Sequence, residues 1–186
     1  MQLREYNVII KNPRMVDVRV ASCYPGPYRT AMSSLGYHII YHLINSRDDA
    51  WCERVIHPYK RSLESGSPLR DFDVISFTVH YEEDYFRILQ MLRDGSISPR
   101  RDERDGPLVI AGGPCITSNP LPLSDFIDLF IIGEAEPVLN RLMDRYLELD
   151  DPRREIDEFM DIKVFTFPTT LQRGSLLRIW TGHATR

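Results

Sequence analysis

Three cysteines and five histidines are the residues of this 186-residue chain best suited to act as nucleophiles or metal ligands. Cys23, Cys52 and Cys115 lie far apart, whereas a cysteine-bound zinc ion or iron–sulfur cluster needs three or four thiolates, usually with two of them a few residues apart. His38 and His42 are one helical turn apart, but no glutamate lies between them as in a His-Glu-x-x-His zinc motif. We therefore predict no metal site in this chain.

Cys23 and His80 are the two residues that could form a nucleophile–base pair. Each follows a short apolar run, so both could lie at the ends of neighbouring strands. A catalytic thiol needs a lowered pKa and a base, whereas a buried cysteine behaves as a small apolar side chain. We keep a hydrolase or thiol enzyme based on this pair only as a third hypothesis, and assign no catalytic residue.

Several common ligand-binding motifs are missing. No Gly-x-Gly-x-x-Gly follows the first apolar run, and no Walker loop with a Gly-Lys-Ser/Thr ending occurs. A phosphoacceptor switch would need acidic residues where Cys23, Tyr24 and Thr78 stand. These absences argue against a dinucleotide-binding Rossmann domain, a P-loop nucleotidase and a response regulator.

Short apolar runs alternate with amphipathic stretches, which is typical of strand–helix–strand units around a parallel sheet. The five expected strands are residues 16–23, 52–57, 73–79, 108–111 and 126–132. Helices are expected between them, and the pattern predicts a three-layer α/β sandwich with right-handed crossovers.

The expected helices have definable faces and ends. In the first helix, Met32, Leu35, Ile39 and Leu43 fall on one apolar stripe, and Gly36 is expected to pack closely on a neighbour.

In the helix that begins near residue 82, Gly95 is the expected C′ residue. The next helix is expected to begin at Pro137, with Val138, Leu139 and Leu142 on its apolar face.

Composition and charge narrow the class of protein further. The chain is 42% hydrophobic and 27% charged, and its length fits one domain of about 150 residues with an appendage. We expect a domain over residues 1–150 and, over 151–186, an acidic helix followed by a linker or disordered tail.

No apolar stretch approaches the ~18 residues of a membrane span, and a net charge of −4 disfavours a nucleic-acid coat protein. With no signal peptide and three scattered cysteines, we expect a cytoplasmic protein.

The connections after the strands are the expected ligand site. In an open α/β sheet, ligands bind outside the carboxyl ends of the strands, where the strand order reverses. Residues 22–28, 78–83, 112–114 and 133–136 form those connections, and three of the four contain glycine. Glycine allows the backbone to approach a bulky ligand closely. We therefore expect the four connections to converge around one slot.

Several sequence blocks resemble the N-terminal domain of a family of radical SAM proteins. They are residues 73–89, 108–114, 119–123 and 126–137, with 20–25 and 32–36 as a further block, so that the likeness covers about residues 16–149. The resemblance implies a flavodoxin-like (Rossmann-like), cobalamin-binding-type α/β fold with a five-stranded, mostly parallel sheet. In that family, a radical SAM barrel follows and holds a [4Fe–4S] cluster and S-adenosylmethionine. No Cys-x3-Cys-x2-Cys motif is present here, so we expect this chain to be the front part of a longer enzyme.

The resemblance also suggests which residues would bind a cofactor. Cobalamin domains with a histidine ligand to cobalt carry Asp-x-His-x-x-Gly after the first strand, where this chain has residues 23–27 and no histidine. Residues 78–80 match the family's Ser-x-Leu loosely, and residues 112–113 match its paired glycines. Residues 133–136 resemble its Gly-Glu-x-Glu turn, whose acids could hold a ribose hydroxyl or cap a helix. The expected cofactor-binding residues are Tyr24, Gly26, Thr78, His80, Gly112, Gly113, Gly133, Glu134 and Glu136.

The leading hypothesis is a cobalamin-binding-type domain of a radical SAM iron–sulfur enzyme, which binds or shields a cofactor or substrate at the carboxyl ends of its strands. Cobalamin would be bound without a histidine ligand, and the chain alone would have no turnover. The alternative is a structural docking domain that covers the radical SAM barrel and leaves the crevice empty. In both cases the expected partner is that barrel in cis, with neither a membrane nor a nucleic acid as a partner.

Overall fold

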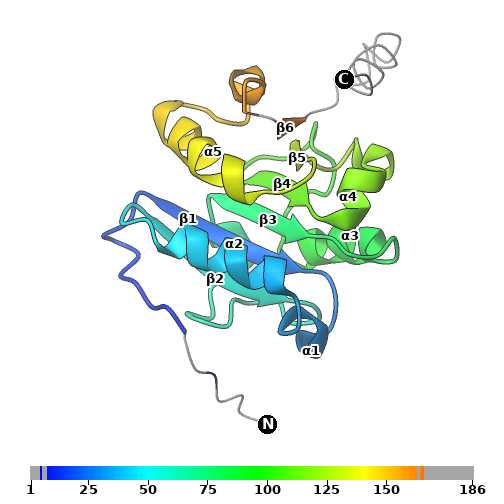
Figure 1. Ribbon diagram of the computed structural model, residues 1–186, viewed down its shortest axis with the longest axis horizontal. Coiled ribbons are helices and arrows are strands. Elements are labelled where there is room, and N and C mark those ends of the chain that lie inside the picture. Colours follow the sequence, from blue (N-terminus) through cyan, green and yellow to red (C-terminus); the bar gives the residue numbers. More distant parts are fainter. Residues whose placement is uncertain (1–4, 6–7, 163, 166–186) are drawn as a thin grey trace.

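The computed structural model describes residues 5, 8–162 and 164–165 as one six-stranded sheet with helices on both faces (Figure 1). The strands are β1 (Val18–Tyr24), β2 (Ala50–Ile56), β3 (Val74–Thr78), β4 (Leu108–Gly112), β5 (Leu129–Ile131) and β6 (Val164–Phe165). Their order is β2-β1-β3-β4-β5-β6; the first five strands pair in parallel, and β6 is antiparallel to β5. The order 2-1-3-4-5 is the flavodoxin-like one. The predicted fold is confirmed.

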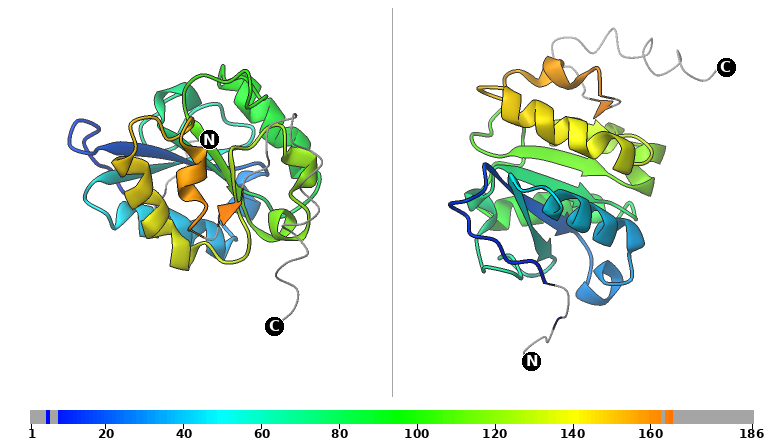
Figure 2. Two further views of the ribbon diagram at one scale, coloured as in Figure 1. Left: turned by 90° about the horizontal axis from the view of Figure 1, so that it is seen from above. Right: turned by 60° about the vertical axis from the view of Figure 1, so that its left-hand side comes forward.

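Helices cover the two faces of the sheet. The α-helices are α1 (Tyr28–Ala31), α2 (Leu35–Asn45), α3 (Asp84–Asp94), α4 (Pro114–Ser118) and α5 (Glu136–Glu148). Three short 3₁₀ turns are η1 (Leu69–Asp71), η2 (Leu121–Leu123) and η3 (Ile156–Phe159). Helices α2 and α5 lie on one face, and α3 and α4 lie on the other (Figure 2). This is the expected three-layer arrangement.

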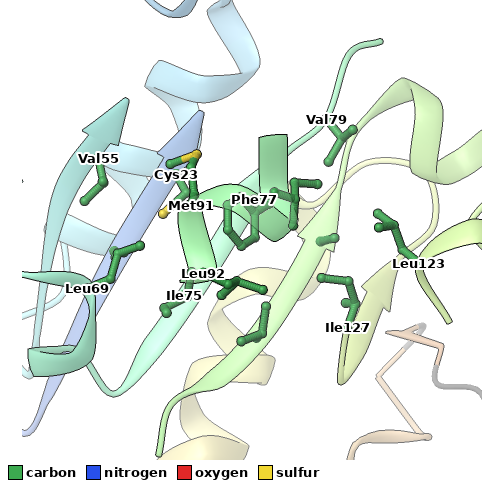
Figure 3. Packing of buried hydrophobic residues seen from close by; sticks show 14 of the residues in the cluster. Cys23, Val55, Leu69, Ile75, Phe77, Val79, Met91, Leu92, Leu123 and Ile127 are labelled. Atoms are coloured by element: carbon green, nitrogen blue, oxygen red, sulfur yellow. The ribbon is translucent and has the colours of Figure 1, made fainter. Parts of the chain in front are cut away.

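Alternate residues of each strand enter different cores, because successive side chains point to opposite faces of a sheet. On the α3/α4 side, Ile75 and Phe77 of β3 pack with Leu92 of α3 and with the thiol-bearing Cys23 (Figure 3). On the α2/α5 side, Val74 belongs to a second apolar cluster. Successive β3 residues thus build both cores.

The buried face of α2 differs from the prediction. Tyr37, Tyr41 and Ile44 are buried, whereas Leu35, expected on the apolar stripe, is 74% exposed. The tyrosines can turn inward because their hydroxyls have partners: Tyr37 donates to the carbonyl of Ser22 at 2.9 Å, and Tyr41 accepts from a backbone amide. The predicted face was based on aliphatic residues alone, so it missed the tyrosines on the buried face of α2.

Two predicted roles of glycine are wrong. Gly36 packs on nothing: a Cβ added there would have no atom within 4 Å. Gly95 has φ −80° and is the C-cap of α3, and Ser96 adopts the left-handed φ of 61° instead. Glycine is needed at position 95 because a Cβ would lie 2.8 Å from the Cβ of Leu69.

The strand and helix boundaries shift by a few residues. Strand β2 begins at Ala50, and β5 is only Leu129–Ile131 where residues 126–132 were predicted. In the predicted extension, Asp128 is buried and its carboxylate accepts from the amide of Val109 at 2.8 Å. Helix α5 begins at Glu136, one residue before the predicted Pro137, so that Pro137 lies in its first turn.

The outer strand β2 carries two buried charges that the following loop satisfies. The Glu53 carboxylate accepts from Arg19 at 2.6 Å and from the hydroxyl of Ser62 at 2.7 Å. The Arg54 guanidinium lies 2.6 Å from the carboxylate of Glu64. These contacts fasten residues 57–68 over this edge of the sheet.

The segment after α5 packs on the same side as α2 and α5. Phe159 of η3 and Ile162 are fully buried in that core, and β6 extends the sheet. The division of the chain at residue 150 stays a prediction, and the predicted tail, residues 171–186, lies outside the described residues. None of the described helices is long and apolar enough to cross a membrane.

Candidate functional site

A cleft of about 240 Å³ opens between α2 and α5 at the carboxyl ends of β3, β4 and β5. Its floor is formed by residues 76–78 of β3 and by Gly112 of β4. One wall carries Gly36 and Ile40 of α2, and the other is formed by residues 133–136 and Leu139. It therefore lies on the α2/α5 side of the sheet, at the edge where ligands of open α/β folds bind.

The cleft exists because the residues around it are small. Val74 of β3 is buried under the helices, but the next residues on the same face are Ser76 and then Thr78, which fill less space. Gly112 on the neighbouring strand has no side chain, and Gly36 leaves open space on the helix opposite. The apolar core stops half-way along β3, and the remaining volume is the cleft.

Hydroxyl groups line this part of β3. Ser76 and Thr78 both border the cleft, and Ser22 lies opposite Ser76 in the parallel β1–β3 register. Ser22 is 0% exposed, and its hydroxyl has no hydrogen-bond partner in the described structure. The sheet thus presents hydrogen-bonding groups where an apolar surface is the usual pattern.

The structure brings together most of the predicted site residues. Seven of the nine border the cleft, namely Thr78, His80, Gly112, Gly113, Gly133, Glu134 and Glu136. Tyr24 and Gly26 do not. The connections after β3, β4 and β5 therefore converge on one slot, whereas the connection after β1 does not contribute to it.

Tyr24 explains why the end of β1 is closed. Its side chain is 2% exposed and packs edge-on against Tyr37 with the ring centroids 5.4 Å apart. A Cβ on Gly26 would lie 2.9 Å from the Tyr24 ring, so this glycine makes room for the tyrosine. The two rings pack with Ile56 at the end of β2, and Tyr24 also reaches His80 after β3, so Tyr24 covers the end of β1 beside the point where the strand order reverses.

His80 stands at the end of β3 on the side toward Tyr24. The two ring centroids are 5.6 Å apart, and the buried Nδ1 of His80 has no partner in the described structure. Burial lowers the pKa of His80, although the nearby Asp84 carboxylate opposes the shift. Burial, with Asp84 and Tyr81 adding to it, raises the pKa of Tyr24 to about 12. At neutral pH the imidazole is therefore in its neutral form.

The mouth of the cleft is acidic and lies at the start of α5. Glu134 and Glu136 are exposed there, and no lysine or arginine is among the described residues that line the cleft. Helix α5 has Ala135 as its N-cap and no side-chain capping bond. Capping by a glutamate was one predicted role for these acids, and this geometry leaves both carboxylates free to face a ligand.

The paired glycines have separate roles. Gly113 has φ 108°, and a Cβ there would lie 2.6 Å from the carbonyl oxygen of Val79. Glycine is therefore needed at position 113, because the backbone of the neighbouring β3–α3 connection lies too close for a side chain. A Cβ on Gly112 would only make an ordinary contact, 3.5 Å from Ile131, so this residue instead keeps the floor of the cleft low.

The cysteines are not arranged for catalysis. Cys23 is 0% exposed, and burial raises the pKa of its thiol well above the usual value. Cys115 is also buried and donates from Sγ to the carbonyl of His80 at 3.1 Å. Among the described residues, no three His, Cys, Asp or Glu side chains form a group that could hold a metal ion. Among the described hydrogen bonds, none joins the Cys23 thiol to the His80 imidazole, and the Nδ1 of His80 has no partner, so the two are not arranged as a nucleophile and its base.

A family profile described as "Radical SAM proteins, N-terminal" matches residues 36–164, which include the whole cleft. The chain belongs to this family. Among curated proteins, it is 32% identical over 148 residues to an uncharacterized protein of Methanocaldococcus jannaschii. That match covers 73% of this chain and 31% of the relative, so the chain spans about a third of the length of the relative. No solved structure gives a significant match.

Part of the cleft lining lies outside the predicted site residues. Ser76 lies within the predicted strand 73–79, and its spacing of two from Thr78 could have placed both hydroxyls on one face. Gly36 was interpreted as a packing residue. Ile40 and Leu139 also line the cleft, and nothing distinguishes them from other apolar helix residues.

Proposed function

We propose that this N-terminal domain is an accessory domain of a larger radical SAM protein, and that its cleft binds the nucleotide portion of a corrinoid. The observation that carries the proposal is the slot itself, which is apolar on its helical walls, hydroxylated on its floor and acidic at its mouth. A nucleoside has the matching chemistry: a flat heterocycle, ring nitrogens that accept hydrogen bonds, and ribose hydroxyls that donate them.

The size of the cleft supports binding of part of the cofactor. Its volume of about 240 Å³ is below the roughly 300–1,000 Å³ of pockets that enclose whole drug-sized ligands. A corrin macrocycle does not fit in such a space, whereas a single heterocycle with its sugar is of the right order. The macrocycle would then remain outside the cleft.

The residues divide into three groups by the part of the nucleotide that they suit. Ser76 and Thr78 on the floor can donate to a ring nitrogen. The carboxylates of Glu134 and Glu136 at the mouth can accept from ribose hydroxyls. Gly36 leaves room for a planar ring to enter beside α2. When bound, the corrinoid supplies the cobalt chemistry, and this chain binds and orients it.

The donor set does not include a histidine from the first connection. Residues 23–27 hold none, and Tyr24 closes that position. The cofactor is therefore expected to bind through its nucleotide, without a cobalt ligand from this connection.

A titration of the purified chain with hydroxocobalamin tests the proposal. We expect a change in the visible spectrum at micromolar concentration and retention of the corrinoid through a desalting column. Absence of retained corrinoid would remove the binding proposal.

Two variants at one position provide the matched control. Gly36→Phe places a ring at the wall of the cleft, and Gly36→Ala adds only a methyl group in open space. We expect at least a tenfold loss of corrinoid affinity for Gly36→Phe and little change for Gly36→Ala, with both variants folded by circular dichroism. Equal binding by both variants would place the corrinoid elsewhere.

A further inference from the structure

A group of buried charges lies at the amino ends of β4 and β5, at the edge of the sheet opposite the cleft. Arg104 precedes β4, Asp128 comes directly before β5, and Arg153 follows α5. The side chain of Arg104 is 0% exposed, that of Asp128 7% and that of Arg153 19%. We call these three residues the Arg104 cluster, and none of them is among the described residues that line the cleft.

Both arginines of the Arg104 cluster donate to backbone carbonyls. Arg153 donates from Nη2 to the carbonyl of Arg101 at 2.7 Å and from Nη1 to the carbonyl of Arg104. Arg104 in turn donates from Nη2 to the carbonyl of Phe126. These bonds fasten together the segment before β4, the segment before β5 and the segment after α5.

The carboxylate of Asp128 does not reach either guanidinium at hydrogen-bond distance. Its Oδ1 lies 3.7 Å from Nη2 of Arg104, and its Oδ2 lies 3.6 Å from Nε of Arg153. The Oδ2 instead accepts from the amide of Val109 at 2.8 Å. Polar groups held this far apart in a protein are commonly bridged by a third species.

Several N–H groups of the two arginines have no acceptor. Nε and Nη1 of Arg104 and Nε of Arg153 are buried and have no hydrogen-bond partner in the described structure. A buried polar group without a partner is destabilising, and more so where it is charged. A guanidinium cannot lose its proton to avoid this cost. These nitrogen atoms therefore require an acceptor.

The Arg104 cluster also has an excess of positive charge. Two guanidinium groups face one carboxylate, which leaves one positive charge, and the third guanidinium nearby, that of Arg101, has Asp125 beside it. Burial lowers the pKa of Arg104 to about 10, although the Asp128 carboxylate opposes the shift. The charges of Arg153 and Arg101 add to it. Arg104 is still charged at neutral pH, so a negative charge is needed for balance.

We propose that the Arg104 cluster binds a small inorganic anion of about the size of chloride, which accepts from the unpaired N–H groups of Arg104 and Arg153. One such ion supplies both an acceptor and a negative charge, whereas a water molecule supplies only the acceptor. A small ion suits the position because all the unpaired nitrogen atoms are buried. It can enter from the side of residues 102–106, where Glu103, Asp105 and Gly106 are exposed around Arg104.

Thermal unfolding of the 186-residue chain tests the proposal. The melting temperature is measured as potassium chloride replaces potassium gluconate at constant ionic strength, because gluconate is too large for a buried position. An ion that binds only the folded chain raises the melting temperature, and we expect a rise of at least about 3 °C. The chloride concentration at which the rise begins reports the affinity.

Variants of two cluster residues should change this chloride dependence in opposite directions. Asp128→Asn keeps an oxygen for the Val109 amide but removes the carboxylate charge, so chloride should bind more tightly. Arg153→Gln removes a positive charge and should weaken chloride binding at least tenfold. Arg100→Gln is the matched control, because Arg100 lies in the same loop but is 43% exposed and paired with Asp102. Each variant is compared with itself in gluconate, so a lower intrinsic stability does not affect the result.

Crystals of the chain grown in bromide locate the ion directly. We expect an anomalous-scattering peak within hydrogen-bond distance of the Arg104 guanidinium, and its loss in crystals of Arg153→Gln. An uncharged water at this position, or the same chloride dependence in all three variants, would overturn the proposal. Stabilisation by phosphate that exceeds that by chloride and is lost in Arg153→Gln would overturn the assignment to a small ion. No corrinoid is involved, so these outcomes are independent of the proposed function.

Discussion

Ser22 and Ser76 lie opposite each other on the adjacent parallel strands β1 and β3, at the point where the apolar core on the α2/α5 side gives way to the cleft. The hydroxyl of Ser22 is completely buried and has no partner in the described structure. Apolar residues precede both serines on this face, Val20 and Val74, which are also opposite each other. The Val20–Val74 pair thus contributes to the apolar core, and the next pair on this face, Ser22–Ser76, lies where the cleft begins.

Replacement of Ser22 should not weaken the fold. An unpaired buried hydroxyl carries its desolvation cost without a compensating bond, so Ser22→Ala should leave the free energy of unfolding unchanged or raise it by about 1 kcal/mol. Ser62→Ala is the control, because the Ser62 hydroxyl donates to the buried Glu53 carboxylate at 2.7 Å. That variant should lose roughly 1.5–3 kcal/mol. Urea unfolding of both variants decides the matter, and equal losses would mean that Ser22 makes a bond of its own.

Two glycines near the cleft should respond in opposite ways to alanine. Gly36 lies in α2 with open space around it, so Gly36→Ala should stabilise the protein by about 0.5–1 kcal/mol. Gly113 has φ 108° and no room for a Cβ beside Val79, so Gly113→Ala should cost at least about 2 kcal/mol. Urea unfolding curves measure both, and a stable Gly113→Ala variant would show that this connection can move.

The pH dependence of stability should contain a contribution from His80. Burial lowers the pKa of its imidazole in the folded state, while the unfolded value is about 6.5. The unfolded chain therefore binds this proton more readily, and the stabilisation is complete above about 6.5 and is lost as the pH falls through the folded pKa.

His80→Gln removes this titration and serves as the measurement. The free energy of unfolding of the natural protein minus that of the variant should decrease between pH 8 and pH 5. A difference that stays constant or grows as the pH falls would mean that the folded protein favours the protonated imidazole.

Alkylation separates a binding domain from a thiol enzyme. Cys23 is completely buried with a raised pKa, so iodoacetamide at pH 8 should modify it far more slowly than free cysteine. In denaturant it should react at the free rate. Rapid modification in the native protein, with a pH dependence set by His80, would restore the thiol-enzyme hypothesis.

Much of the fold could be predicted from the sequence because its signals are local. Continuous β-branched runs ended by glycine or proline marked the strands, and Pro137 marked the first turn of α5. The outward turn of Leu35 was missed because hydrogen bonds to distant backbone groups decide which face of α2 is buried. The short β5 was overestimated because the carboxylate of Asp128 takes over a backbone partner.

The candidate site could be predicted in outline only. The glycines after β4 and β5 border the cleft as expected, since parallel strands end at one edge, whereas Gly26 after β1 does not. The exclusion of Tyr24 could not be foreseen, because its ring meets Tyr37 from a helix more than ten positions away along the chain. Ser76 was missed although it lies two residues from Thr78, a spacing that places both hydroxyls on one face of a strand.

The ring of Tyr24 also limits the space that this fold offers to ligands. Flavodoxin-like sheets offer a natural crevice between their first and third strands, and here one phenol, backed by Tyr37, closes it. Removing that phenol would join the closed crevice to the open slot beside it and create a single, wider chamber. A small residue in place of Tyr24 would therefore leave more room for a ligand at the end of β1.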